Sequence, residues 1–135
     1  MKKIKVSIIM PSLNVAAYIE ECIRSAIGQS LKEIEIICID AGSTDGTVEI
    51  LKEYEKIDQR IHVVNFGVKS YGAQVNYGIS IAQGKYIAIL ETDDFIDSEM
   101  YETLYHVAEN NYVDYAKADF KKFFALNNGE YFYSV

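Results

Sequence analysis

Three carboxylates, Glu91, Asp93 and Asp94, lie within four consecutive positions of the chain. Neighbouring carboxylates repel one another and lose hydration where they crowd, and a divalent cation beside them would relieve both costs. The chemistry that this spacing favours is therefore metal binding through oxygen ligands. The same acids could instead lie in the first turn of a helix, where negative charge is stabilised. Taken alone, the stretch supports both interpretations equally.

The acids follow an apolar run at residues 87–90, with Gly84 shortly before it. A short apolar run bounded by turn residues is typical of a buried β-strand. The acids would then lie at the carboxyl end of that strand, which is where open parallel sheets bind their ligands. The place of this strand in a sheet therefore decides between the two interpretations.

Strand and helix patterns alternate four times along the chain. Apolar and β-branched runs predict strands at residues 5–10, 35–39, 61–65 and 87–90, the first of them stopped by Pro11. Helical spacing predicts helices at 19–27 before Gly28, at about 44–57 with Ser43 or Thr44 as N-cap, at 72–83, and after a Ser98 cap with Met100, Leu104, Val107 and Ala108 inward. This alternation predicts an α/β fold, with a mostly parallel sheet covered by helices on both faces. A further strand at 113–119 and a hairpin that turns at Asn128 and Gly129 into residues 131–133 would follow.

Polar side chains follow three of the predicted strands, at the point where each strand ends. They are Ser12 and Asn14 after the first strand, Asp40, Ser43 and Asp45 after the second, and the three acids after the fourth. If the strand order is 3-2-1-4, these loops line one crevice. That convergence favours a binding site over three separate solvated turns, although Asp45 alone is better explained as a helix cap.

Composition limits the classes of protein and partner. The 135 residues are enough for one domain, and 20 acidic against 13 basic residues give a net charge of −7. A chain this acidic is a poor match for nucleic acid, whose phosphates need a basic surface. Cys22 and Cys38 lie in apolar segments and are expected to be buried thiols. The basic start is too short for a signal peptide or a membrane span, so we expect a cytoplasmic domain, with a peripheral membrane location open for a longer protein.

The loop after the first strand excludes the common glycine-rich nucleotide folds. It reads PSLN at residues 11–14, where a dinucleotide-binding fold needs Gly-x-Gly-x-x-Gly, and the chain contains no Gly-x-x-x-x-Gly-Lys-Ser/Thr. The pattern leaves a sheet that holds a diphosphate through a metal on carboxylates.

Four segments of the chain, in order, resemble the signatures of the family 2 glycosyltransferases. Residues 6–14 (VSIIMPSLN) and 39–47 (IDAGSTDGT) look like the first two, residues 76–78 with 82–87 are similar to the third, and residues 90–95 (LETDDF) resemble the metal-binding Asp-x-Asp region. The likeness runs from about residue 6 to residue 97. Any one of these segments would be weak evidence, whereas four in order are a strong signal.

This resemblance implies a GT-A fold, which is Rossmann-like, and transfer of a sugar from a nucleotide-diphosphate sugar to a saccharide or other acceptor hydroxyl, with inversion. Asp94 would be the direct ligand of Mg²⁺ or Mn²⁺, and Asp93 would face the ribose or share the metal. The base and ribose pocket would be lined by Pro11, Ser12, Asn14 and Asp40. A nucleotide-sugar-binding module without turnover is the alternative, and the sugar, the linkage and the kind of acceptor glycan stay open.

The chain departs from the family pattern at three positions. Ala41 stands where a second aspartate, which commonly contacts uracil, is usual, and Val75 replaces a frequent arginine. Glu91 stands where aspartate is usual and would reach the metal directly or through water. Lys69 or Lys85 could replace the missing cation, although a solvated surface lysine explains each more simply.

Members of this family need roughly another hundred residues, more than the minimum length of a single domain, to supply the acceptor site and a catalytic base. Residues 1–135 are therefore expected to be the N-terminal, donor-binding part of a truncated domain, and the catalytic base is unassigned. Asn76 is equally well explained as a site residue or as a structural one. Core or interface packing, including a homo-oligomer contact, is expected of the aromatic residues Phe120, Phe123, Phe124, Tyr131, Phe132 and Tyr133.

Overall fold

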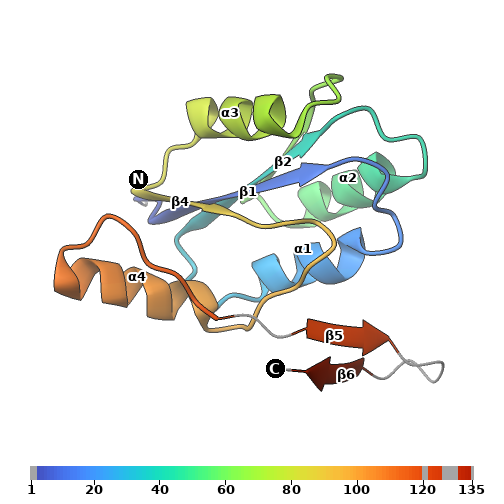
Figure 1. Ribbon diagram of the computed structural model, residues 1–135. Helices are drawn as coiled ribbons and strands as arrows, with labels where there is room; N and C mark the ends of the chain where they lie inside the picture. Colours follow the sequence, from blue (N-terminus) through green and yellow to red (C-terminus); the bar gives the residue numbers. More distant parts are fainter. Residues whose placement is uncertain (1–2, 120–121, 126–130, 135) are drawn as a thin grey trace.

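The four predicted parallel strands form one sheet in the order β3-β2-β1-β4. The computed structural model describes residues 3–119, 122–125 and 131–134. The strands are β1 (Val6–Ser12), β2 (Ile34–Asp40), β3 (Ile61–Asn65) and β4 (Tyr86–Ile89), and every neighbouring pair is parallel (Figure 1). This order confirms the expected one, and it places β1 between β2 and β4, so that the loops after these three strands leave the same edge of the sheet.

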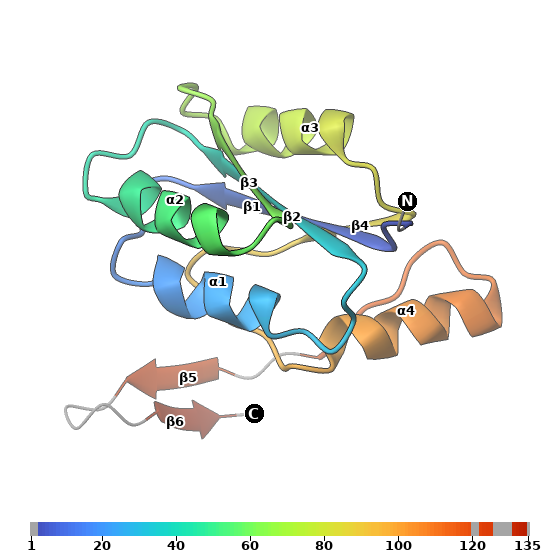
Figure 2. The ribbon, with the colours of Figure 1, turned by 180° about the vertical axis from the view of Figure 1, so that it is seen from behind.

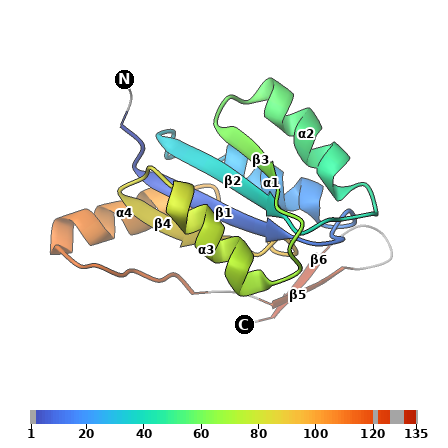
Figure 3. The same cartoon turned by 90° about the horizontal axis from the view of Figure 1, so that it is seen from above.

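Helices cover both faces of the sheet, as the alternating pattern predicted. Figures 1 and 2 show α3 (Tyr71–Ile81) on one face and α1 (Ile19–Ile27) with α2 (Thr47–Ile57) on the other. The fourth helix, α4 (Met100–Asn111), lies beyond β4 on the side of α1. The view from above shows α3 lying along the strands (Figure 3).

The core is built on β1 and β2, in which every residue is buried. Such runs suit a strand that has helices on both faces, because neither face meets water. The predicted face of α1 is confirmed, since Ile19, Cys22, Ile23 and Ala26 are buried and Gly28 ends the helix. Both cysteines are free and buried, as expected.

The prediction that Pro11 ends the first strand is wrong. Pro11 and Ser12 continue β1 and pair in register with Ile39 and Asp40. The carbonyl of Pro11 accepts a hydrogen bond from Thr92 Oγ1 on the β4 side, where strand pairing has already stopped at Ile89. In a parallel ladder the N–H and C=O of one residue face the same neighbour, so the N–H that proline lacks would have found no partner strand there.

The prediction that the fourth strand is buried is also wrong. The strand exists, but Ile87 and Ile89 are 45% and 46% exposed, and among the described residues no strand pairs with the outer edge of β4. An apolar run therefore identified the strand, while its place at the sheet edge decided the exposure of alternate residues.

Helix starts differ from the predicted ones. The residue before α2 is Gly46, with a left-handed φ of 99°, because Ser43 and Thr44 are held by the neighbouring loop. The residue before α4 is Glu99, not Ser98, and Val107 is 44% exposed. Residues 113–119 contain no strand. At the start of α2, contacts from the distant Asn14 override the local capping preference.

The last described elements, β5 (Lys122–Ala125) and β6 (Tyr131–Ser134), pair antiparallel and confirm the predicted hairpin. The turn at Asn128 and Gly129 lies outside the described residues, as do Phe120 and the other aromatic side chains of this region. Homo-oligomer formation through them therefore stays a prediction. In the described part of the chain, no helix has the length and apolar character needed to cross a membrane.

Candidate functional site

The carboxylate of Asp40, at the end of β2, ties together the loops after β1 and β2. Its Oδ1 accepts hydrogen bonds from Ser12 Oγ (2.8 Å) and Ser43 Oγ (2.6 Å). Its Oδ2 accepts from the backbone N–H groups of Gly42 (2.9 Å) and Ser43 (2.7 Å). Asp40 is only 1% exposed. Its charge is therefore balanced by four donors, and in this geometry it shapes the loop.

Asn14 connects the same loops closer to the surface. Its side-chain oxygen accepts from the N–H of Thr44 at 2.8 Å, and its own N–H donates to Ser43 Oγ at 2.8 Å. Asn14 has a left-handed φ of 51°, which asparagine tolerates better than most residues. The exposed Asn14 thus fixes where the chain leaves β1.

Asp45 anchors the start of α2 against the loop after β1. Its carboxylate accepts hydrogen bonds from the hydroxyl and N–H of Thr47 and from the N–H of Ala16. These bonds, above all the one from the Thr47 hydroxyl, lower the pKa of Asp45 below its ordinary value. The structure therefore gives Asp45 the capping task that the sequence favoured.

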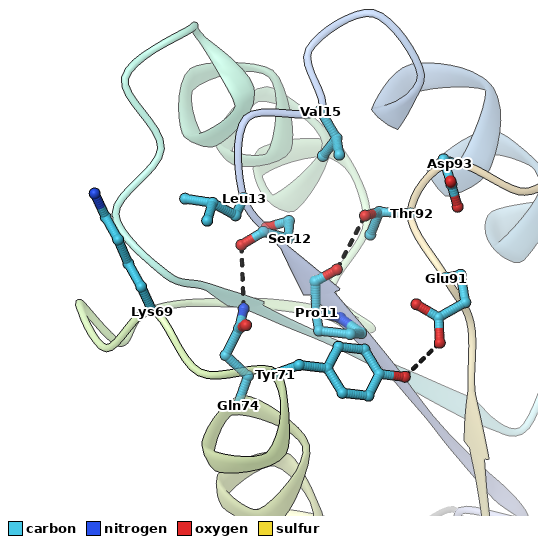
Figure 4. A pocket seen from close by; sticks show the side chains of 10 residues that line it. All are labelled: Pro11, Ser12, Leu13, Val15, Lys69, Tyr71, Gln74, Glu91, Thr92 and Asp93. Atoms are coloured by element: carbon cyan, nitrogen blue, oxygen red, sulfur yellow. Dashed lines mark hydrogen bonds between the residues drawn. The ribbon is translucent and has the colours of Figure 1, made fainter.

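A cavity of about 310 Å³ opens beside these loops (Figure 4). Its lining comes from the end of β1, the start of α3 and the segment after β4: Pro11, Ser12, Leu13, Val15, Lys69, Tyr71, Gln74, Glu91, Thr92 and Asp93. Of the predicted site residues, Pro11, Ser12 and Asp93 line this cavity. Asn14 and Asp40 do not line it and hold its walls instead.

The start of α3 brings two unpredicted side chains to the cavity. Ser70 caps the helix by accepting a bond from the N–H of Ala73. Tyr71 then donates its hydroxyl hydrogen to Glu91 Oε1 across the cavity, and this bond is the main cause that raises the pKa of Tyr71 to about 12. Gln74 Nε2 donates to the carbonyl oxygens of Ser12 (3.1 Å) and Ile39 (2.8 Å). One helix thereby joins the ends of all three strands.

The acidic stretch after β4 divides between two hollows of the surface. Glu91 and Asp93 line the cavity, while Asp94, together with Glu91, lines a larger groove of about 1130 Å³ along β4 and α4. Thr92, which is 5% exposed, anchors the stretch through its bond to Pro11. Burial and then the negative charges of Asp93 and Glu91 raise the pKa of Asp94. The three acids are therefore close enough to repel one another.

The acids fit a cation only if another ligand shares it. Across the residues that the structure describes, no three His, Cys, Asp or Glu side chains converge on one point that could hold a metal ion. Carboxylate oxygens are nonetheless the ligands that Mg²⁺ takes when substrate phosphates and water complete its shell. Glu91 borders both hollows, with Asp93 in the cavity and Asp94 in the groove, so a cation beside Glu91 would be within reach of both aspartates.

The remaining candidate site residues differ in whether they line the cavity. Asn76 is exposed and does not line the cavity, and Ala41 is buried. Lys85 pairs with Glu109, away from the cavity, whereas Lys69 lines it. No motif in the sequence marked Tyr71 or Gln74 as a site residue. A weaker signal was available for Gln74, because it is a polar residue directly before the apolar Val75 on the inward face of a predicted helix.

Comparisons with known proteins identify the family of this chain. Residues 7–133 match the family model described as Glycosyl transferase family 2. The uncharacterized glycosyltransferase EpsJ of Bacillus subtilis is 40% identical over 117 residues, which cover 87% of this chain and 34% of EpsJ. The first curated relatives are all longer, and the chain spans 34%, 43% and 20% of their lengths.

Solved structures share the sheet and its helices. The structure of S. aureus TarS 1–349 in complex with UDP-GlcNAc matches with a TM-score of 0.75 and 26% identity over 81% of this chain and 32% of that chain. The mannosyltransferase PcManGT from Pyrobaculum calidifontis, in complex with GDP-Man and Mn²⁺, matches in fold with a TM-score of 0.63 and 22% identity, over 69% of this chain and 28% of that one. The fold is therefore the GT-A fold, and the chain belongs to glycosyl transferase family 2.

Proposed function

We propose that the cavity binds a nucleotide-diphosphate sugar and that the chain is the donor-binding part of a metal-dependent, inverting glycosyltransferase. The observation that carries this proposal is a cavity lined by the end of β1, the start of α3 and the segment after β4, with two carboxylates at its wall, while the loop after β2 holds the loop after β1 in place. A related chain, TarS, has been solved with a sugar donor of this class, UDP-GlcNAc.

The chain's own residues prepare the site before any donor arrives. Asp40 and Asn14 hold the loops that carry Pro11 and Ser12 to the cavity wall. The Thr92 bond to Pro11 fixes the acidic stretch against β1. Preorganised loops of this kind reduce the entropy that binding would otherwise lose. The base and ribose would lie against Pro11 and Ser12, and the diphosphate would lie toward the acids.

Asp93 and Asp94 would hold Mg²⁺ or Mn²⁺ in this proposal, with Glu91 beside them. When bound, the cation would stabilise the negative charge that develops on the departing nucleoside diphosphate. The carboxylates also keep the diphosphate from binding without a cation, since like charges repel. The other substrate would be a saccharide hydroxyl, which a general base must deprotonate on the opposite face of the sugar.

Binding without turnover is the second candidate for this chain by itself. It is motivated by the length of the curated relatives, of which the chain spans less than half. A separate residue must supply the general base, and none of the cavity residues is matched to that role. The two candidates are separated by measuring the release of nucleoside diphosphate by this chain and by a longer chain.

Calorimetry tests the proposed donor site. UDP-GlcNAc and GDP-mannose would be titrated into the chain with Mn²⁺ and again with EDTA. We expect binding of at least one donor only with Mn²⁺, and Asp93→Asn with Asp94→Asn should weaken it at least about tenfold, because a charge-assisted contact contributes about 1.5–3 kcal/mol.

The matched control is Glu53→Gln, which removes one negative charge from an exposed pair with Lys56 on α2. This variant should bind like the original chain. If the double variant binds donors as tightly as Glu53→Gln does, the acids hold no cation and the proposed function is wrong.

A further inference from the structure

The amide of Gln74 is held in one orientation at the cavity. Both N–H groups of Nε2 are used, at 3.1 Å from Ser12 O and 2.8 Å from Ile39 O. Because both neighbours are carbonyl acceptors, rotating the amide by half a turn would place oxygen against oxygen. The side chain is only 5% exposed and lines the cavity beneath Ser12 (Figure 4).

A second buried glutamine shows what a purely structural amide does in this fold. Gln29 Nε2 donates to the carbonyls of Ser25 (3.1 Å) and Asp97 (2.7 Å), and its Oε1 accepts from the N–H of Tyr101 at 3.1 Å. Gln74 repeats the two donated bonds, but among the described residues nothing donates to its Oε1. Among the described side chains, Gln74 Oε1 is not one of the fully enclosed atoms without a partner, so it keeps some accessible surface, and Gln74 lines the cavity.

Among the described residues, the lining around Gln74 carries no acid that could hold a cation for a diphosphate. In Figure 4, Leu13 and Gln74 lie on one side of Pro11, and the acids Glu91 and Asp93 lie on the other. A diphosphate held through a cation belongs near the acids. The nucleobase of the same ligand is then left with the side of the cavity that carries Leu13, Lys69 and the Gln74 amide.

We infer that Gln74 Oε1 accepts a hydrogen bond from the ring N–H of the nucleobase and thereby selects uracil or guanine over cytosine and adenine. This inference rests on the proposed function. Uracil and guanine carry a hydrogen on a ring nitrogen, whereas the corresponding nitrogens of cytosine and adenine are acceptors. An acceptor facing the locked Oε1 would leave both atoms unpaired in a buried place, which is how polar sites reject analogues. Ala41, at the end of β2, carries no polar side-chain atom that could perform this task.

The test compares nucleotides with and without that hydrogen. UDP, GDP, CDP and ADP would be titrated into the 135-residue chain with Mn²⁺, followed by N3-methyl-UDP or N1-methyl-GDP. We expect UDP or GDP to bind about tenfold tighter than CDP and ADP, and methylation to weaken the preferred nucleotide by a similar factor, as expected for one hydrogen bond of about 1.4 kcal/mol.

Two variants then separate base recognition from support of the fold. Gln74→Met removes Oε1, so the methylated and unmethylated nucleotides should bind within about twofold of each other, since the coupling energy is gone. Gln29→Met loses the same kind of buried amide away from the cavity and should keep the full effect of methylation. Thermal unfolding confirms that each variant is folded.

Three results would overturn the inference. One is a preference for CDP or ADP. Another is equal binding of methylated and unmethylated nucleotides by the original chain, a result that can be observed without any variant. The third is a Gln74→Met chain that keeps the full discrimination. If no nucleoside diphosphate binds at all, the proposed function fails together with the inference, whereas binding without coupling to Gln74 overturns the inference alone.

Discussion

The two walls of the cavity are stabilised in opposite ways. Behind the wall formed by the end of β1, the acids Asp40 and Asp45 each accept several hydrogen bonds from the loops that they hold. On the wall after β4, Glu91, Asp93 and Asp94 crowd together, and burial, followed by the negative charges of Asp93 and Glu91, raises the pKa of Asp94. The first wall is thus held by its own donors, whereas the second would gain stability from the proposed cation.

This difference teaches which acids belong to the fold and which to the site. Acids whose oxygens already accept several bonds have little left to offer a ligand, even when they lie close to the cavity. Acids that repel one another are available to a cation, because binding it removes an existing cost. The comparison makes three predictions, of decreasing size.

The largest effect is expected from Asp40→Ala. The substitution leaves the hydroxyl of the 3% exposed Ser12 and the N–H groups of Gly42 and Ser43 without their acceptor. We expect a loss of about 3–5 kcal/mol in the free energy of unfolding, measured by urea denaturation, since a buried charged group with several bonds is removed. Glu53→Ala on the exposed face of α2 is the control and should cost little. A loss no larger than that of the control would show that Asp40 does not hold the wall together.

An effect of intermediate size, with opposite signs on the two walls, is expected in the pH dependence of stability. The pKa of Asp45 is lowered in the folded state, so its contribution is present above the unfolded pKa, near 3.8, and is lost as pH falls through the folded value. The pKa of Asp94 is raised, so its ionisation destabilises the fold above that value, and the penalty vanishes as pH falls toward 3.8.

Urea denaturation between neutral and acidic pH, with EDTA present, measures both effects. Asp45→Asn should be less stable than the original chain at pH 7, and the difference should shrink in acid. Asp94→Asn should be slightly more stable at pH 7, with that gain also shrinking in acid. If both substitutions change stability in the same direction at pH 7, the two walls do not differ as described.

The smallest effect is expected from Tyr71→Phe, which removes the bond between the two sides of the cavity. Tyr71 is 52% exposed and its hydroxyl donates only to the exposed Glu91. The free energy of unfolding should fall by less than about 1 kcal/mol, because water replaces the partner of each group. Tyr77→Phe on the same helix, where Tyr77 is 38% exposed, is a matched control. If Tyr71→Phe, but not the control, lowered the free energy of unfolding by several kcal/mol, the bond between Tyr71 and Glu91 would be essential to the cavity wall and this prediction would be wrong.

Much of the fold could be predicted, because the determining signals are local. The apolar runs of β1 and β2 and the helical spacing of Ile19, Cys22, Ile23 and Ala26 each specify one element, and the alternation of elements implies the parallel sheet. The predicted bounds of the strand at residues 61–65 agree with those of β3. The prediction failed at Pro11 and at the cap of α2, where contacts with Thr92 and Asn14, both distant in sequence, decide the local conformation.

The sequence by itself determined that polar side chains follow three strands of a parallel sheet, with carboxylates after the second and the fourth, because strand periodicity and the order of the motifs are properties of the chain alone. Only the tertiary structure decided what each carboxylate does. Asp40 and Asp45 meet donors that come from the loop after β1, Glu91 and Asp93 meet the cavity, and Asp94 meets the groove beside α4. The oxygen of Gln74 is likewise available only because the ends of β1 and β2 occupy its nitrogen. How many donors a carboxylate meets depends on residues far apart in the chain, so it is determined only when the loops come together in space.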